Sequence, residues 1–355
     1  MDFRKKTVRD VDVAGKTVLV RVDYNVPIKD GQIADDMRIR ASLPTLEYLI
    51  EQGANKIIVI SHLGRPDGKP EPELSLMPAA KHLAELMPGR TVRFINEIAG
   101  DDVKVAVNNL PQAGILMLEN LRFSPDEEAN SDDFASAIIS ATGAELFVQD
   151  GFAVMHRAHA STDAIARKIP AVAGFLVEKE VTSLEGAMAN PERPLLVIIG
   201  GAKVEDKQPL IDKFLPIADE IAIGGKIAAD GYRPYDDKIY VANEFVTDEN
   251  GAKLDISKDC AAEIMVKVMA SKTVIWNGTL GMVEDPRYAK ASQAVARAIG
   301  SHECFSIIGG GDTTGFVDTL KDEGLKFSLV STGGGACLEL LSGKALPGLE
   351  VLQDR

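Results

Sequence analysis

Basic side chains follow several apolar runs in the first half of the chain. The segments are RVDYNVP at 21–27, SHLGRP at 61–66, LENLRF at 118–123 and QDGFAVMHRAHAS at 149–161. With Arg38 added, the set comprises Arg21, Arg38, His62, Arg65, Arg122, His156, Arg157 and His159. A single arginine is more simply explained as a surface charge. The whole set indicates a site for a small phosphorylated acid, because arginine makes forked contacts with phosphate and carboxylate.

Glycine-rich turns take the place of these basic residues in the second half. They occur in IIGGAKVEDK at 198–207, AIGGK at 222–226, WNGTLGMVE at 276–284, IIGGGDTTG at 307–315 and VSTGGGACLELL at 330–341. One glycine pair is a weak signal, since glycine also serves wherever a turn needs positive φ. Repeated junctions of strand, glycine and helix are stronger, because backbone N–H groups and helix amino termini then face an anion. Phosphate binding is the expected use.

Two lysines and one aspartate add charge to these turns. Lys203 and Lys207 are four residues apart in an expected first helical turn, so both ammonium groups could reach one phosphate chain. Asp312 could meet a magnesium ion, which prefers few carboxylates together with phosphate oxygens. Helix capping is the alternative role for Asp312. Neither the phosphate-binding loop G-x-x-x-x-G-K-[ST] nor the dinucleotide fingerprint G-x-G-x-x-G is matched, and Thr314 stands where the last glycine of the latter should be.

Composition excludes several classes of partner. The formal net charge of −14 argues against general binding to nucleic acid or to anionic lipid. No run approaches the roughly 18 apolar residues of a membrane span, so we expect a cytoplasmic protein without a membrane partner. The cysteines Cys260, Cys304 and Cys337 lack metal-ligand spacing and are interpreted as structural thiols.

The elements that must position these residues alternate between strand and helix. Strands are predicted at 17–22, 56–60, 91–95, 115–119 and 145–148, and again at 195–199, 220–223, 238–241, 273–276, 304–308 and 327–330. Helices are predicted at 40–51, 76–86, 132–141, 258–270, 287–299 and 313–323. We therefore predict an α/β fold of two doubly wound, Rossmann-like parallel-sheet domains. The charged segment 178–185, closed by prolines at 191 and 194, predicts a hinge helix between them.

In this order, the motifs resemble phosphoglycerate kinase over nearly the whole chain. The specific segments are RVDYNVP, SHLGRP, LENLRF, HRAHAS, GGAKVEDK, WNG, GGGDT and STGGGA. The resemblance implies reversible, magnesium-dependent phosphoryl transfer from 1,3-bisphosphoglycerate to ADP, giving 3-phosphoglycerate and ATP. It also implies a phosphoglycerate-binding domain at 1–174, a hinge helix and linker at 175–194, a nucleotide-binding domain at 195–341 and a segment at 342–355 that returns to the first domain. We expect a monomer.

The resemblance further assigns site residues. Phosphoglycerate would be held by Asp23, Asn25, Arg38, His62, Arg65, Arg122 and Arg157. The magnesium nucleotide would be held by Gly201, Ala202, Lys203, Lys207, Gly224, Gly225, Asn277, Glu284, Gly310, Gly311, Asp312 and Thr313, with Glu284 at the ribose and Asp312 on the metal. Arg38 and Lys207 would act as the catalytic pair that meets the transferring phosphoryl group.

Two other functions stay open on the sequence. The stretch 226–272 is shorter than in the family, and Lys226 follows Gly224 and Gly225 where a third glycine is usual. A regulatory protein that binds phosphoglycerate and has an impaired nucleotide site is therefore one alternative, and the preferred base is left open. A nicotinamide-dependent dehydrogenase is the other, although the missing fingerprint argues against it.

Overall fold

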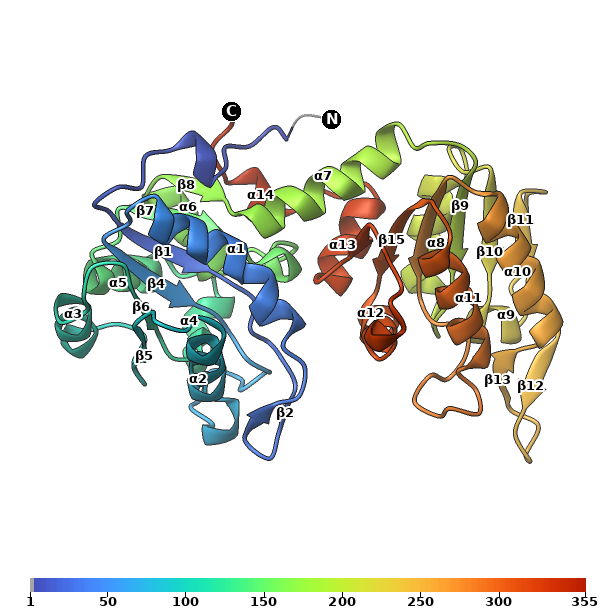
Figure 1. Cartoon of the computed structure of the whole chain (residues 1–355), viewed down its shortest axis with the longest axis horizontal. Helices are drawn as coiled ribbons and strands as arrows, with labels where there is room; N and C mark the ends of the chain where they lie inside the picture. Colours follow the sequence, from blue (N-terminus) through green and yellow to red (C-terminus); the bar gives the residue numbers. More distant parts are fainter. Residues whose placement is uncertain (1–2) are drawn as a thin grey trace. The chain divides into compact units, whose positions relative to one another are not determined.

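The computed structural model describes residues 3–355 and separates into two compact units (Figure 1). The first unit contains residues 3–181 together with Ala345–Arg355, and the second contains Thr182–Lys344. Helix α7 (Phe175–Ala189) begins in the first unit and ends in the second.

A parallel sheet forms the centre of the first unit. Its strand order is β5-β6-β4-β1-β7-β8, with bounds Val92–Phe94, Gly114–Met117, Lys56–Ile60, Thr17–Arg21, Leu146–Gln149 and Ala171–Ala173. Every pairing in this sheet is parallel. Strand β1 is flanked by β4 on one side and β7 on the other, so the winding reverses there. Ligands bind outside the strand ends at such a switch point.

Helices cover both faces of this sheet. They are α1 (Met37–Glu51), α2 (Met77–Leu86), α3 (Asp101–Asn108), α4 (Pro125–Glu128), α5 (Asp132–Thr142) and α6 (Ile165–Lys168). Short helix α14 (Pro347–Glu350) near the carboxyl terminus belongs to the same unit, since Gly348 N donates to Met155 O at 2.9 Å. The core is built from the apolar strand residues, with Val18, Val20 and Val59 fully buried.

The second unit repeats the architecture. Its strand order is β11-β10-β9-β14-β15-β16, with bounds Ile239–Val241, Glu220–Ile223, Leu195–Ile199, Thr273–Asn277, Phe305–Gly309 and Leu329–Val330. The covering helices are α8 (Val204–Phe214), α9 (Gly225–Ala229), α10 (Lys258–Ala270), α11 (Lys290–Ser301), α12 (Gly311–Asp318) and α13 (Gly334–Leu341). All six strands pair in parallel. The predicted pair of doubly wound parallel-sheet domains is thus confirmed.

Several elements differ from those predicted. The helix expected at 313–323 is interrupted, since α12 ends at Asp318 and a separate 3₁₀ turn spans Lys321–Glu323. Strand β8, helix α3 and the antiparallel hairpins β2 (Ile28–Lys29) with β3 (Gln32–Ile33) and β12 (Phe245–Thr247) with β13 (Lys253–Ile256) were not predicted. Most of these are strands too short to show a period of two. None of the helices found between residues 3 and 355 has the length and apolar character needed to cross a membrane.

Candidate functional site

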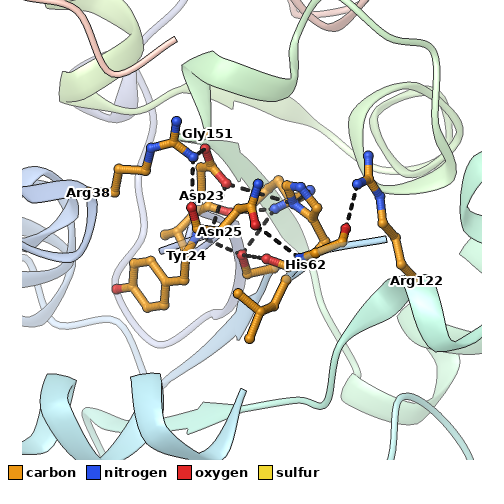
Figure 2. Close-up of polar contacts among 12 residues, drawn as sticks. Asp23, Tyr24, Asn25, Arg38, His62, Arg122 and Gly151 are labelled. Atoms are coloured by element: carbon orange, nitrogen blue, oxygen red, sulfur yellow. Dashed lines mark hydrogen bonds and ion pairs between the residues drawn. The ribbon is translucent and has the colours of Figure 1, made fainter. Parts of the chain in front are cut away.

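The ends of strands β1 and β4 carry the first part of the candidate site (Figure 2). Arg38, at the start of α1, donates from Nη1 to Asp23 Oδ2 at 2.7 Å and to Asn25 O at 2.9 Å. The carboxylate of Asp23 is buried, whereas the Arg38 side chain is 27% exposed. Asn25 Oδ1 accepts a hydrogen bond from Gly64 N at 2.9 Å, which ties the loop after β1 to the loop after β4. Asp23, Asn25 and Arg38 therefore form one connected group.

His62 lies beneath this group and is almost fully buried. Its Nδ1 is 3.7 Å from Asp23 Oδ1 and 3.1 Å from Arg21 Nη2. Burial and the nearby guanidinium groups of Arg21, Arg122 and Arg38 hold the pKa of His62 well below its usual value. A neutral imidazole is the result.

Arg21 was expected to face the anion with the other basic residues, and this expectation is wrong. The side chain is 1% exposed, because its guanidinium turns inward and donates from Nε to Ser161 Oγ at 2.8 Å. Ser161 in turn donates from its backbone N to Glu127 Oε2 at 3.0 Å and from Oγ to Glu127 Oε1. Burial raises the pKa of Glu127 and lowers that of Arg21. Arg21, Ser161 and Glu127 thus form a buried hydrogen-bonded network under the site. Glu127 and Ser161 were not predicted from the sequence.

A polar cavity of about 430 Å³ opens beside this group in the first unit. Arg65, Arg122 and Arg157 line it together with Glu128. Arg122 donates to Gly64 O at 2.8 Å, and Gly64 N donates to Asn25, so the loop after β4 links the cavity wall to the Asp23 group. Burial and the surrounding arginines lower the pKa of His159 to about 4. Six of the seven predicted phosphoglycerate residues follow the ends of β1, β4, β6 and β7, and Arg38 reaches the group from the start of α1.

A second cavity, of about 250 Å³, lies in the second unit. Its lining includes the predicted residues Gly201, Ala202, Gly225, Glu284 and Asp312. Further lining residues come from the unpredicted β12–β13 hairpin and from the loop after β14: Phe245, Lys253, Leu254, Leu280 and Met282. Apart from Lys253 this part of the wall is apolar, and its location depends on the hairpin, which was not predicted.

Glycine is required where the backbones of two strand ends meet. Gly201 N donates to Thr279 O at 2.9 Å. A Cβ atom on Gly278 would lie 2.2 Å from Gly200 O, and Gly278 also has a φ of +100°. Both constraints exclude larger residues. The turns after β9 and β14 therefore pack directly against each other.

Polar side chains hold this sheet edge in place. The ammonium of Lys207, in the first turns of α8, donates to Asn277 Oδ1, and burial lowers its pKa. Thr313 is buried, and its Oγ1 accepts a hydrogen bond from Gly278 N at 2.8 Å. Lys203 occupies the N-cap position of α8 and is exposed. Only Lys207 of the two lysines is therefore enclosed at the strand ends.

Asp312 is the one predicted metal ligand. It is the second residue of α12, whose N-cap is Gly310 with a φ of +89° and no side-chain capping bond. The alternative that Asp312 caps the helix is therefore wrong. Its exposed carboxylate lines the cavity beside Gly201 and Ala202. Over residues 3–355 no group of three or more His, Cys, Asp or Glu side chains could hold a metal ion by itself, so a cation here would need ligand oxygens.

Comparisons with known proteins agree across the chain. The family model described as "Phosphoglycerate kinase" matches residues 8–233 and 233–344. Proteins of that name from Dictyoglomus turgidum and Moorella thermoacetica are each 40% identical, with 99% of this chain and 100% of each relative covered. The solved structure of phosphoglycerate kinase from Coxiella burnetii has a TM-score of 0.79 at 30% identity, and that from Pyrococcus horikoshii OT3 has 0.87 at 28%. Each comparison covers 98% of both chains.

Proposed function

Since the chain belongs to the phosphoglycerate kinase family, we propose how its residues divide the work of that reaction. The enzyme transfers a phosphoryl group reversibly from 1,3-bisphosphoglycerate to ADP and forms 3-phosphoglycerate and ATP, a step of glycolysis. Such transfer needs little covalent help. It depends on holding two anionic reactants in line and on offsetting the charge of the moving group.

The phosphoglycerate is assigned to the first unit. The observation that carries this assignment is the polar cavity lined by Arg65, Arg122 and Arg157 in a protein of net charge −14. The phosphate of the substrate would occupy this cavity, where forked arginine contacts are strong. The carboxylate and hydroxyl end would lie toward Asp23, Asn25 and His62. Arg38 would shift from its contact with Asp23 toward the reacting group.

The nucleotide is assigned to the second unit. Its phosphates would lie beside Gly201 and contact the backbone N–H groups of Ala202 and of the start of α12, and its base would lie toward the hairpin side of the cavity. Glu284 would meet the ribose. The proposed set of nucleotide-binding residues is completed by Lys203, Gly224, Gly225, Asn277, Gly310, Gly311 and Thr313.

Magnesium fits the donor set at Asp312. A single exposed carboxylate beside a cavity that accepts phosphates matches the preference of this ion for few protein ligands. When bound, the ion would offset negative charge on the nucleotide phosphates. Lys207 supplies a further positive charge from the protein itself, held by Asn277 before any ligand arrives.

Arg38 from one unit and Lys207 from the other are proposed as the catalytic pair. For both to meet one phosphoryl group, the mechanism needs a hinge, and residues 175–194 are proposed as that hinge. The assignment of 1–174 and 342–355 to phosphoglycerate and 195–341 to nucleotide is part of the same proposal. Expulsion of water from the reacting groups would accompany the transfer. A monomer in the cytoplasm remains the prediction.

A coupled assay with 3-phosphoglycerate, ATP and magnesium tests this function. Turnover that depends on all three supports the proposal. Binding of 3-phosphoglycerate without turnover would instead favour a regulatory protein with an impaired nucleotide site. Titration with NAD addresses the dehydrogenase alternative, for which we expect no binding.

A further inference from the structure

The side chains around His62 determine which ring nitrogen carries the proton. Arg21 Nη2 lies 3.1 Å from His62 Nδ1. A guanidinium group has donors only, so Nδ1 must accept this bond. A neutral ring that accepts at Nδ1 carries its proton on Nε2. The competing acceptor, Asp23 Oδ1, is 3.7 Å from Nδ1 (Figure 2), which is beyond hydrogen-bond length.

Arg21 cannot easily leave this position. Its Nε donates to Ser161 Oγ at 2.8 Å, its Nη1 donates to Val22 O, and the side chain is 1% exposed. Ser161 is itself fixed by the buried carboxylate of Glu127. The guanidinium thus points one donor at His62, while its Nε and Nη1 donate to other groups of the first unit. A buried cation held in this way would keep the imidazole ring in one orientation.

The other ring nitrogen has no such partner. Across residues 3–355 no protein group makes a hydrogen bond to His62 Nε2, although the residue is only 4% exposed. Nε2 is not among the buried side-chain atoms that lack a partner, so this nitrogen reaches the molecular surface, where an acceptor on a ligand is its expected partner. The phosphoglycerate oxygens assigned to this group of residues are such acceptors.

We propose that Arg21 is a positioning residue that fixes His62 as the Nε2–H tautomer, so that His62 binds an oxygen of phosphoglycerate as a neutral hydrogen-bond donor. This rests on the proposed assignment of that substrate to the first unit. The charged and titratable groups that face His62 are Arg21 from β1, Asp23 from the loop after β1, Arg38 from α1, Arg122 from the 3₁₀ turn at Leu121–Phe123, and His159. All but Asp23 are basic and oppose a positive charge on the ring.

Nitrogen-15 NMR of the full chain with labelled histidine tests the proposal without any turnover. In the wild type without ligand we expect His62 to be protonated on Nε2 alone and unchanged between pH 5 and pH 8. Addition of 3-phosphoglycerate should shift the Nε2 resonance. In Arg21→Met we expect proton density on Nδ1, where Asp23 can accept it, and a titration that appears within this pH range.

Kinetics supply the matching readout. Arg21→Met should raise the KM for 3-phosphoglycerate roughly fivefold to tenfold, as for the loss of one hydrogen bond, and should make that KM depend on pH. Arg167→Met, which removes an exposed arginine paired with Asp163, is the matched control and should leave both unchanged. Ser161→Ala, a smaller change that frees Arg21 Nε, gives a second variant should the methionine protein not fold. Ser161→Ala should also increase the proton density on His62 Nδ1.

Three results would overturn the proposal. The first is a wild-type His62 with its proton on Nδ1. The second is a variant series in which neither the tautomer nor the pH profile changes. The third is an Nε2–H resonance whose chemical shift does not change when 3-phosphoglycerate is added. That result would exclude the contact between His62 and the substrate. The proposed function would be unaffected, because turnover tests it separately.

Discussion

Lys207 donates a hydrogen bond from its ammonium to Oδ1 of Asn277, the last residue of β14. Lys207 follows β9 on helix α8, and β9 pairs with β14, so the bond joins two neighbouring strand ends. Asn277 is fully buried, and its Nδ2 has no partner within the part of the chain that the structure describes. The hydrogen bond thus holds the Lys207 charge in place at these strand ends before a ligand binds.

Removal of the Lys207 charge should affect catalysis far more than folding. We expect Lys207→Met to lower turnover by about 2–4 kcal/mol of transition-state stabilisation, the range for one preorganised donor. Stability should fall little, because burial already disfavours the charge and lowers the lysine pKa. Lys213→Met, at an exposed position on the same helix, is the control for steady-state kinetics and thermal unfolding. Equal turnover in the two variants would refute the role.

Glycine variants separate backbone strain from loss of the close approach. Gly278 and Gly231 both have positive φ, +100° and +88°, but a Cβ atom on Gly231 would meet no atom within 4 Å. Gly231→Ala should therefore cost only about 1 kcal/mol of stability. Gly278→Ala should cost several times more and should also weaken ADP binding, because the turn after β9 must move. Calorimetric titration with ADP measures the second effect. Similar ADP affinities for both variants would count against the proposed role of the turn after β9 in nucleotide binding.

The buried carboxyl of Asp150 predicts a distinct pH dependence of stability. Burial raises its pKa from 3.8 to about 7, and its Oδ1 accepts a bond from Leu176 N at 3.0 Å at the start of α7. Between pH 4 and pH 7 the unfolded chain therefore releases a proton that the folded protein retains. Stability contributed by this group is lost as the pH rises through that window.

Asp150→Asn should remove that loss, since an amide oxygen can still accept from Leu176. We expect the variant to be more stable than the wild type at pH 8 by a few kcal/mol, at about 1.4 kcal/mol per pKa unit, and nearly equal at pH 4. Thermal unfolding followed by calorimetry at several pH values measures this. Asp101→Asn, at an exposed position of α3, should show no such trend. A stability difference that is the same at every pH would contradict the prediction.

Substitution of an arginine that lines the first cavity should weaken the binding of one ligand only. Arg122→Ala should weaken 3-phosphoglycerate binding by about 1.5–3 kcal/mol, the contribution of one charge-assisted hydrogen bond, and should leave ADP affinity unchanged. Arg90→Ala is an exposed control in the same unit. Parallel titrations with both ligands distinguish the effects. A loss of ADP affinity that matches the loss for phosphoglycerate would indicate general unfolding rather than a ligand contact.

Much of the candidate site could be predicted from the positions at which the strands end. The apolar runs at β1, β9 and β14 are fully buried on both faces, as is β4 after Lys56, and such runs are predictable without alternation. Because parallel strands end at one edge, residues such as Arg65 and Arg122 could be grouped from the sequence alone. Antiparallel hairpin β12–β13 carried a turn signal at Asn250-Gly251, where Gly251 has a φ of +81°. That signal was available although it was not used.

The inward turn of Arg21 could not be predicted. Arg21 stands in the same kind of segment as the other basic residues, and only the packed sheet decides which of them faces the core. Glu127 lies in the acidic run at 126–128, which resembles a solvated surface. Its burial depends on Ser161, which is distant in sequence and reaches it only in the folded unit.

Arg38→Ala, compared with Arg40→Ala, tests the proposed transfer mechanism most directly. Arg38 contacts Asp23 at the strand end, whereas Arg40 on the same helix is exposed and pairs with Asp36. Turnover with 3-phosphoglycerate and ATP should fall by about 2–4 kcal/mol in Arg38→Ala, with ADP affinity preserved, and should hardly change in Arg40→Ala. Unchanged turnover in Arg38→Ala, or an equal fall in both variants, would contradict a phosphoryl transfer that depends on Arg38.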